Sequence, residues 1–385
     1  MAQLHTELCD LLGIRHPILQ GGMGPYKTEA LAIAVSNARA LGVISTIGMA
    51  ATLLPEAAPI DARRLFGDDP PLVILQKSIE AVTAGTRTSG GIFGVNVPVA
   101  AEFIMVSEMF VRHVIEAREA DSDIERRLRV LITSAGNPKP WAKVKERGLI
   151  WIHVVPSVYH ARKAEEAGAD IIVASGHEGG AHVAWEPAHS MVLVPAVARA
   201  VKTPVVAAGG FCDGASLAAA LCLGAVGIQM GTRFIATQES DFERIWKDAI
   251  TERDERETLV ARGLFGPMRF LRNQRAEMLV EQTLHDIPHF YLGTPVNSNK
   301  AILELEQKGF VDLLDQKPDT ALMFGGEVVG RIDDLPKVQE LVSQIVGDAT
   351  KILGSVPRKV LTKSLGQSGV APRKRVHHAP VKGKR

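Results

Sequence analysis

The sequence predicts an α/β fold, a TIM (β/α)8 barrel with a helical cap inserted after the eighth strand. Three observations lead to this prediction. Short, almost continuously apolar segments alternate with helical segments, as in parallel sheets that are covered on both faces. Eight such segments occur within about the first 230 residues, whereas an open doubly wound sheet usually has about six. Turns that contain Gly or Pro follow these segments, as expected for tight connections between strands and helices.

The expected elements follow one another in regular order. The strands are predicted at residues 17–20, 43–46, 93–97, 130–133, 152–155, 171–174, 205–208 and 226–230. The helices between them include residues 27–40, 101–117, 158–167, 187–201 and 214–223. Each strand with its following helix forms one βα unit, so the barrel is expected to span residues 1–236.

Two stretches interrupt this repeat. Residues 49–91 are long for one unit and contain Pro55, Pro59, Pro70 and Pro71, which predicts a loop excursion before or around a helix. Residues 237–322 are mostly helical in pattern and highly charged, with an amphipathic run at 269–281, which predicts a helical cap. A final amphipathic helix at 333–353 lies in a segment, 323–354, that is expected to return to the barrel.

The charge is distributed unevenly along the chain. Of 44 Lys and Arg, nine lie in residues 355–385, where there is no Asp or Glu. The remainder has 35 basic against 43 acidic residues, a net charge of −8. An acidic body makes nucleic acid an improbable partner of that surface. The basic tail is predicted to be disordered and is the one electrostatic candidate for anionic partners.

The composition also indicates where in the cell the protein is expected. Three scattered cysteines, Cys9, Cys212 and Cys222, are too few for a disulfide scaffold or a structural zinc site, so a cytoplasmic location is expected. The first 17 residues are mixed polar and do not resemble a signal peptide. Residues 30–54 are apolar but broken by Asn37 and Arg39, which indicates a helix and a strand, with no membrane insertion.

Paired glycine turns at the last two strands predict a phosphate site. Gly209 and Gly210 open a helix after the seventh strand, and Gly231 and Thr232 follow the eighth. Backbone amides at these two positions commonly hold one phosphate in TIM barrels. Either turn alone would be an ordinary βα connection, and it is the pair at consecutive strands that favours a phosphate.

The segment after the sixth strand, Gly176 to His182, contains two histidines and a glutamate among three glycines. A metal site is one interpretation, but no further Cys, His or Asp cluster accompanies these residues, so no metal is predicted. One histidine is then a hydrogen-bonded loop residue, and the other lies beside a cofactor as acid, base or hydrogen-bond donor.

Seven motifs give the sequence a resemblance to a known family. They are PILQGGM (17–23), GVNVP (94–98), AGNP (135–138), VVPSV (154–158), HEGGAH (177–182), PVVAAGGFCDG (204–214) and GIQMGTRFIATQES (227–240). Together they resemble the FMN-dependent nitronate monooxygenases, formerly called 2-nitropropane dioxygenases, and their close relative, the FMN-dependent enoyl-ACP reductase. The resemblance implies an oxidoreductase with FMN bound non-covalently at the mouth of the barrel.

The resemblance also implies roles for single residues. In the family, a glutamate is followed by a small residue, two glycines and the catalytic histidine. Residues 178–182 match this pattern, with Ala181 in place of the second glycine, so the resemblance implies that His182 is the catalytic histidine. The residues expected to bind FMN are Gly22, Met23, Asn96, Ser175, Gly180, Ala181, Gly209, Gly210, Gly231 and Thr232.

Three functions remain open. The leading hypothesis is oxidation of alkyl nitronates with O2 to a carbonyl compound and nitrite. The alternative is an NAD(P)H-dependent reductase of an enoyl thioester or quinone, favoured by AGNP and by Val154-Val155-Pro156, where many nitronate monooxygenases have a lysine. A third reading is a non-redox phosphate-binding barrel whose basic tail acts as a tether. The sequence leaves the oligomeric state open, a homodimer included.

Overall fold

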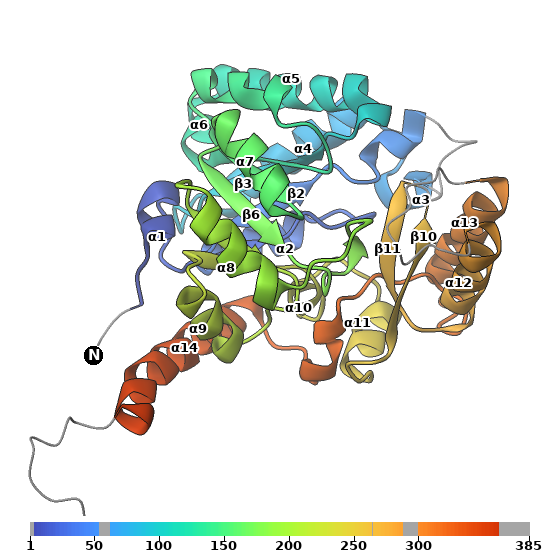
Figure 1. Ribbon diagram of the computed structural model, residues 1–385. Helices are drawn as coiled ribbons and strands as arrows, with labels where there is room; N and C mark the ends of the chain where they lie inside the picture. The colour runs from blue at the N-terminus through green and yellow to red at the C-terminus, as the bar shows by residue number, and fades with distance from the viewer. Residues whose placement is uncertain (1–3, 54–61, 264, 288–298, 362–385) are drawn as a thin grey trace, which may run out of the picture.

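The computed structural model describes residues 4–53, 62–263, 265–287 and 299–361. Eight parallel strands form one sheet in the order β1-β9-β8-β6-β5-β4-β3-β2. They are β1 (Ile18–Gln20), β2 (Gly42–Ser45), β3 (Phe93–Pro98), β4 (Leu128–Ser134), β5 (Ile150–Val155), β6 (Ile171–Ser175), β8 (Val205–Ala208) and β9 (Gly227–Met230). Each of the eight predicted strands overlaps one of these, and the predicted TIM barrel is confirmed (Figure 1).

The seam between β1 and β2 closes the barrel through a side chain. Among the described residues, backbone pairing at this seam consists of an isolated bridge between Leu19 of β1 and Leu41, which directly precedes β2. The buried amide of Gln20 donates to the carbonyl of Val43 at 2.9 Å and accepts from the Val43 N–H at 3.1 Å. Gln20 thereby satisfies the backbone groups of β2 that a regular ladder would otherwise pair.

Helices surround the sheet (Figure 1). In chain order they are α2 (Glu29–Asn37), α4 (Pro71–Gly85), α5 (Ile104–Ala120), α6 (Ser122–Arg127), the 3-10 helix η3 (Lys139–Arg147), α7 (Val158–Glu166), α8 (Ser190–Ala200) and α9 (Gly214–Cys222). The short α1 (Glu7–Leu12) places Leu8 and Leu12 in the apolar cluster that fills the barrel interior. This helix closes the amino-terminal end of the barrel and leaves the carboxyl ends of the strands for the site.

The region after β9 is largely helical, as expected, with α10 (Thr232–Ile235), α11 (Arg244–Thr251), α12 (Gln274–Asp286) and α13 (Lys300–Leu314). It also contains a hairpin of β10 (Thr258–Gly263) and β11 (Gly266–Leu271) in residues that were predicted to be helical. The hairpin continues onto β7 (Ala181–His182), which pairs antiparallel with β11. The prediction was wrong there because pairing with a distant segment decides the conformation, and local periodicity does not contain that information.

Two further segments can be compared with the prediction. The first contains the expected helix, and the second ends later than expected. Residues 49–91 hold η1 (Met49–Leu53), α3 (Ala62–Phe66) and α4, so the described part of this stretch is mainly helical. Pro71 is the first residue of α4, where its missing N–H costs nothing, while Pro55 and Pro59 lie outside the described residues. The final helix, α14 (Val338–Val360), continues beyond the predicted end at residue 353, and residues 362–385 of the tail lie outside the described range.

Within the described ranges no helix combines the length and the apolar character that crossing a membrane requires.

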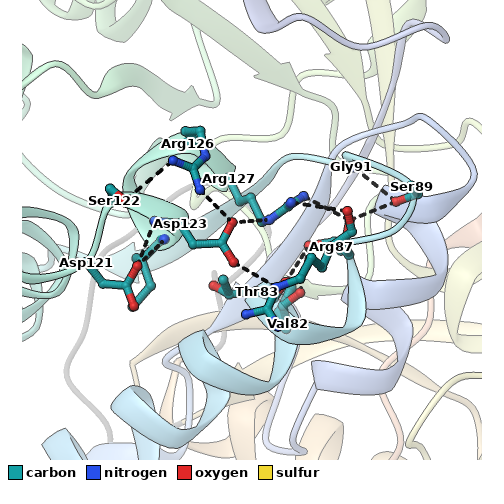
Figure 2. A network of polar contacts seen from close by, with 12 residues as sticks. Val82, Thr83, Arg87, Ser89, Gly91, Asp121, Ser122, Asp123, Arg126 and Arg127 are labelled. Atoms are coloured by element: carbon teal, nitrogen blue, oxygen red, sulfur yellow. Dashed lines mark hydrogen bonds and ion pairs between the residues drawn. The ribbon is translucent and has the colours of Figure 1, made fainter.

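A polar network fastens α4 to α6 at the end of the barrel away from the strand carboxyl ends (Figure 2). The carboxylate of Asp123 accepts from Arg87 and Arg127, each at 3.0 Å, and from Arg126 at 3.3 Å. Arg127 also donates to the carbonyl of Thr86, at the end of α4, at 2.9 Å. The hydrogen bond from Arg87, followed by those from Arg127, holds the pKa of Asp123 below its usual range.

We expect Asp123→Asn to lower the thermal midpoint by about 1–2 °C, because two of the three arginines are solvent-exposed and exposed ion pairs stabilise little. Circular dichroism melts at neutral pH measure this difference. In about 1 M salt the difference should largely disappear, since the interaction is screened. A loss of equal size at both ionic strengths would assign the effect to packing instead of charge.

Candidate active site

The predicted site residues converge on one end of the barrel. They are Gly22 and Met23 after β1, Asn96 in β3, Ser175 at the end of β6, Gly180, Ala181 and His182 in the following segment, Gly209 and Gly210 after β8, and Gly231 and Thr232 after β9. All lie at the carboxyl ends of parallel strands, which meet at one mouth. In TIM barrels this mouth carries the active site.

Free backbone amides gather at the last two strands. Gly209 and Gly210 both have φ of +85°, a conformation that favours glycine. Within the described residues, the amide N–H groups of Gly209, Gly210, Gly231 and Thr232 have no hydrogen-bond acceptor. Backbone amides left free at strand and helix ends form a natural cradle for an anion. This geometry supports the predicted phosphate site, which we call the amide nest.

A segment from far along the chain completes the nest. The hydroxyl of Thr232 accepts from the Gly326 N–H at 3.0 Å, so its own hydrogen is free to donate to a ligand. A Cβ on Gly180 would lie 2.8 Å from the backbone of Gly325, so the two chains pack backbone against backbone. The Glu327 N–H donates to the carbonyl of Glu178 at 3.0 Å. The sequence analysis did not assign residues 325–327 to the site.

The two walls beside the nest also meet closely. A Cβ on Gly22 would lie 2.3 Å from the amide carbon of Asn96, so only glycine allows this contact. Asn96 is almost fully buried, and the sulfur of Met23 lies 3.6 Å from where a Cβ on Gly231 would stand. Residues from β1, β3 and β9 thus form a continuous surface of backbone and small polar groups.

Gln229 in β9 is a further site candidate that the sequence analysis missed. Its Oε1 is buried and has no hydrogen-bond partner within the described residues. Its neighbours Ile228 and Met230 pack in the outer core, so the alternation of the strand points Gln229 into the barrel. A buried acceptor without a donor suits a ligand N–H. The available signal was a single amide side chain in the apolar strand GIQM.

Glu178 has a structural role and does not face a ligand. Its carboxylate accepts from the backbone N–H of Ser190 at 2.9 and 3.0 Å and from the Ser190 hydroxyl at 2.7 Å. It therefore caps α8 where the helix dipole favours a negative charge. In the described part of the chain, no group of three or more His, Cys, Asp or Glu residues is arranged to hold a metal ion.

His177 anchors the loop that leads to His182. Its N–H donates to Ala188, and its carbonyl accepts from Arg269 at 3.0 and 3.2 Å. Burial, and then the positive charge of Arg269, lower the pKa of His177 to about 4. The ring is therefore neutral near pH 7. Only backbone groups of His177 make these hydrogen bonds, and Nδ1 of its ring is buried without a partner among the described residues, so the structure does not show the predicted hydrogen-bonded histidine side chain.

His182 is held by the hairpin, because β7 pairs it with Met268 of β11. Desolvation by the surrounding protein lowers the pKa of His182 to about 4, while the residue itself is exposed at the surface of the mouth. The imidazole is neutral near pH 7 and can accept a proton or donate a hydrogen bond.

A buried chain of hydrogen bonds positions the loop after β4. The indole N–H of Trp151 donates to the hydroxyl of Thr133 at 2.8 Å, and this hydroxyl bonds Nδ1 of His153 at 2.7 Å. His153 also bonds the backbone carbonyl of Gly136, in the AGNP loop. Burial lowers the pKa of His153 to about 4, while the bond to Gly136 opposes that shift.

We expect stability to fall as the pH drops from about 6.5 to about 4, because the unfolded chain takes up protons that His153 in the folded chain does not. The loss from His153 alone is roughly 2–3 kcal/mol. Urea denaturation across this pH window measures it. His153→Gln should make the dependence less steep without abolishing it, because His177 and His182 also have a pKa lowered to about 4. An unchanged slope in the variant would contradict the assignment.

Comparison with known proteins decides the family. The model of the nitronate monooxygenase family matches residues 5–348. The chain belongs to this family. Its members are oxidoreductases, and dependence on a flavin is general among them. The reading as a non-redox binding barrel is therefore wrong.

Two relatives differ in what their names describe. A probable nitronate monooxygenase of Staphylococcus saprophyticus is 32% identical, covering 71% of this chain and 80% of that protein. A protein of Rhodococcus jostii is 30% identical, covering 91% of this chain and 97% of its own length. It is named (3aS,4S,5R,7aS)-5-hydroxy-7a-methyl-1-oxo-octahydro-1H-indene-4-carboxyl-CoA dehydrogenase.

Solved structures share the fold. FabK from Thermotoga maritima superposes with a TM-score of 0.73 at 30% identity, covering 93% of this chain and all of that one. A nitroalkane oxidase from Streptomyces ansochromogenes has a TM-score of 0.67 at 22% identity, which shows similarity of fold alone.

Proposed function

We propose that the protein is an FMN-dependent oxidoreductase that oxidises alkyl nitronates with O2 to a carbonyl compound and nitrite. The observation that carries the proposal is the placement of His182, which β7 holds at the same mouth as the amide nest. Family membership and the nitronate monooxygenase named in Staphylococcus saprophyticus support it. In this proposal residues 1–236 bind FMN, and residues 237–322 contribute to the substrate region.

The residues of the mouth fit FMN. The free amides of the nest and the hydroxyl of Thr232 would hold its phosphate, while Gly22, Met23 and Asn96 would line its ring. Ser175 lies at the end of β6 within the same mouth, and the unpartnered acceptor of Gln229 suits a ring N–H. When bound, FMN supplies the electron-accepting group that protein side chains lack.

The chain itself positions the substrate and handles protons. Neutral His182 can donate a hydrogen bond to a nitronate oxygen. If a neutral nitroalkane binds instead, the same imidazole can accept the proton of its α-carbon, which leaves the nitronate. Ala181 has φ of +59°, a left-handed conformation that is unusual outside glycine. This turn presents the backbone of Gly180 and Ala181 to the mouth, where their amides would lie near the flavin or the substrate oxygens.

A test of this function is anaerobic mixing of the FMN-loaded protein with propionate 3-nitronate. The flavin absorbance should bleach within the mixing experiment and return when O2 is admitted, with nitrite formed. Absence of any bleaching by nitronates would contradict the proposal.

A second candidate is an NAD(P)H-dependent reductase of an enoyl thioester or quinone. It is favoured by the 97% coverage of a relative named as a carboxyl-CoA dehydrogenase and by the apolar Val154 and Val155 at the end of β5. Rapid anaerobic bleaching by NADH or NADPH, without any nitronate, would support this candidate over the first.

A further inference from the structure

The hairpin β10–β11 crosses part of the barrel mouth. At one side it is joined to β6 through His182, whose Cα partner is Met268. At its tip, the ring of Phe265 meets the ring of Phe103 edge-on, with centroids 4.6 Å apart. Phe103 ends the 3-10 helix η2 (Ala101–Phe103) directly after β3, and β4 and β5 separate β3 from β6 in the sheet. The hairpin therefore spans from one wall of the mouth to another.

A third aromatic residue lies at the tip of the hairpin. The Val183 N–H donates to the carbonyl of Pro267 at 3.0 Å, which continues the pairing beyond β7. A Cβ on Gly266 would lie 3.7 Å from the indole nitrogen of Trp185. Trp185 is only three residues from His182, so their Cα atoms are at most roughly 10 Å apart.

These aromatic residues remain open to solvent in part. The side chain of Phe265 is 49% exposed, and Phe103 and Trp185 are partly exposed. We call Phe103, Trp185 and Phe265 the aromatic cluster. Exposed apolar groups gathered at the mouth of a site indicate a binding surface.

Both arginines of this hairpin are already engaged. Arg262 is buried and pairs with Asp286 at 2.5 Å. Arg269 donates to His177, to the Thr258 hydroxyl at 3.0 Å and to Glu327 at 2.9 Å. Its guanidinium is almost fully buried, so it offers no charge to a ligand at the tip. The cluster is thus suited to an uncharged apolar group.

We propose that the aromatic cluster binds the apolar chain of the substrate while its reacting group lies at His182. The substrate class is then a nitronate with a medium or long alkyl chain, in preference to a short one. This inference rests on the proposed function, and the same cluster would hold the acyl chain of a thioester.

The test uses binding, so that it does not depend on turnover. Straight-chain carboxylates from butanoate to decanoate are titrated into the FMN-loaded protein by calorimetry, as unreactive mimics of nitronates. Affinity should rise about threefold to fourfold for each added methylene. In Phe265→Ala the increase per methylene should fall to less than twofold, and Phe265→Leu should restore most of it.

A matched control is Tyr159→Ala, an exposed aromatic residue at the start of α7 that lies outside the cluster. It should keep the full dependence on chain length. Equal dependence in Phe265→Ala and wild type, or no dependence in wild type, would overturn the proposal. If Phe265→Ala does not fold, Phe103→Ala provides the same comparison.

The outcomes separate this inference from the proposed function. If the binding affinity depends on chain length but no nitronate bleaches the flavin, the role of the aromatic cluster is supported and the nitronate reaction is rejected. Bleaching by short and long nitronates with equal kcat/KM, together with flat binding, would reject the cluster and retain the reaction.

Discussion

Gly210→Asp should reduce FMN affinity about a thousandfold. The carboxylate would stand in the amide nest, where the phosphate is expected, and two like charges about 4 Å apart near a protein surface repel by roughly 4 kcal/mol. A Cβ at Gly210 would not clash, since its nearest neighbour, on Glu178, would lie at an ordinary 3.5 Å, and the cost to the fold is the backbone strain of a side chain at φ +85°. Fluorescence titration of the apoprotein with FMN measures the affinity.

Gly210→Asn is the matched control. Asn and Asp have similar size and both tolerate positive φ better than other residues, so the backbone cost at +85° is shared. The Asn variant should lose about tenfold or less in affinity, since it brings no charge. Equal affinities of the two variants would show that the phosphate does not bind at Gly210.

His182→Ala should lower kcat with a nitronate by about 10²- to 10⁴-fold and leave FMN binding within a few-fold of wild type. The loss follows from removal of the imidazole that β7 places at the mouth. His182→Gln keeps a hydrogen-bond donor but cannot take a proton near neutral pH. If kcat of His182→Gln lies well above that of His182→Ala, the role of His182 is to donate a hydrogen bond. If the two variants have equal kcat, its role is to transfer a proton.

The pH profile adds a second readout for His182. Because desolvation lowers its pKa to about 4, the ring stays neutral above that value. We expect kcat/KM of the wild type to show no inflection from His182 between about pH 5 and 8. A turnover loss below threefold in His182→Ala would contradict a catalytic role.

The barrel was predictable because each strand is buried on both faces and therefore leaves an apolar run in the sequence. Residues 171–174 illustrate this, since they read as continuously apolar and form the core of β6. The β10–β11 hairpin was not predictable in the same way. Its conformation depends on pairing with Ala181 and His182, about 85 residues away in the sequence.

In the site, too, residues that directly follow a strand were predictable, and residues brought in by distant contacts were not. Gly209, Gly231 and His182 follow strands directly, so correct strands place them at one mouth. Gly326, which donates to Thr232 at 3.0 Å, reaches the nest only through the path of the chain after the cap. In the sequence, Glu178 stands between two histidines and was considered for a metal site. In the structure it caps α8 through Ser190, a contact that forms only in the folded chain.

The position of the FMN phosphate tests the central claim most directly. A crystal structure of the complex with FMN should place the phosphate oxygens about 2.7–3.2 Å from amide nitrogens of Gly209, Gly210, Gly231 or Thr232. The flavin ring should then lie between Asn96 and His182. A phosphate bound elsewhere on the barrel, or a ring remote from His182, would contradict the account.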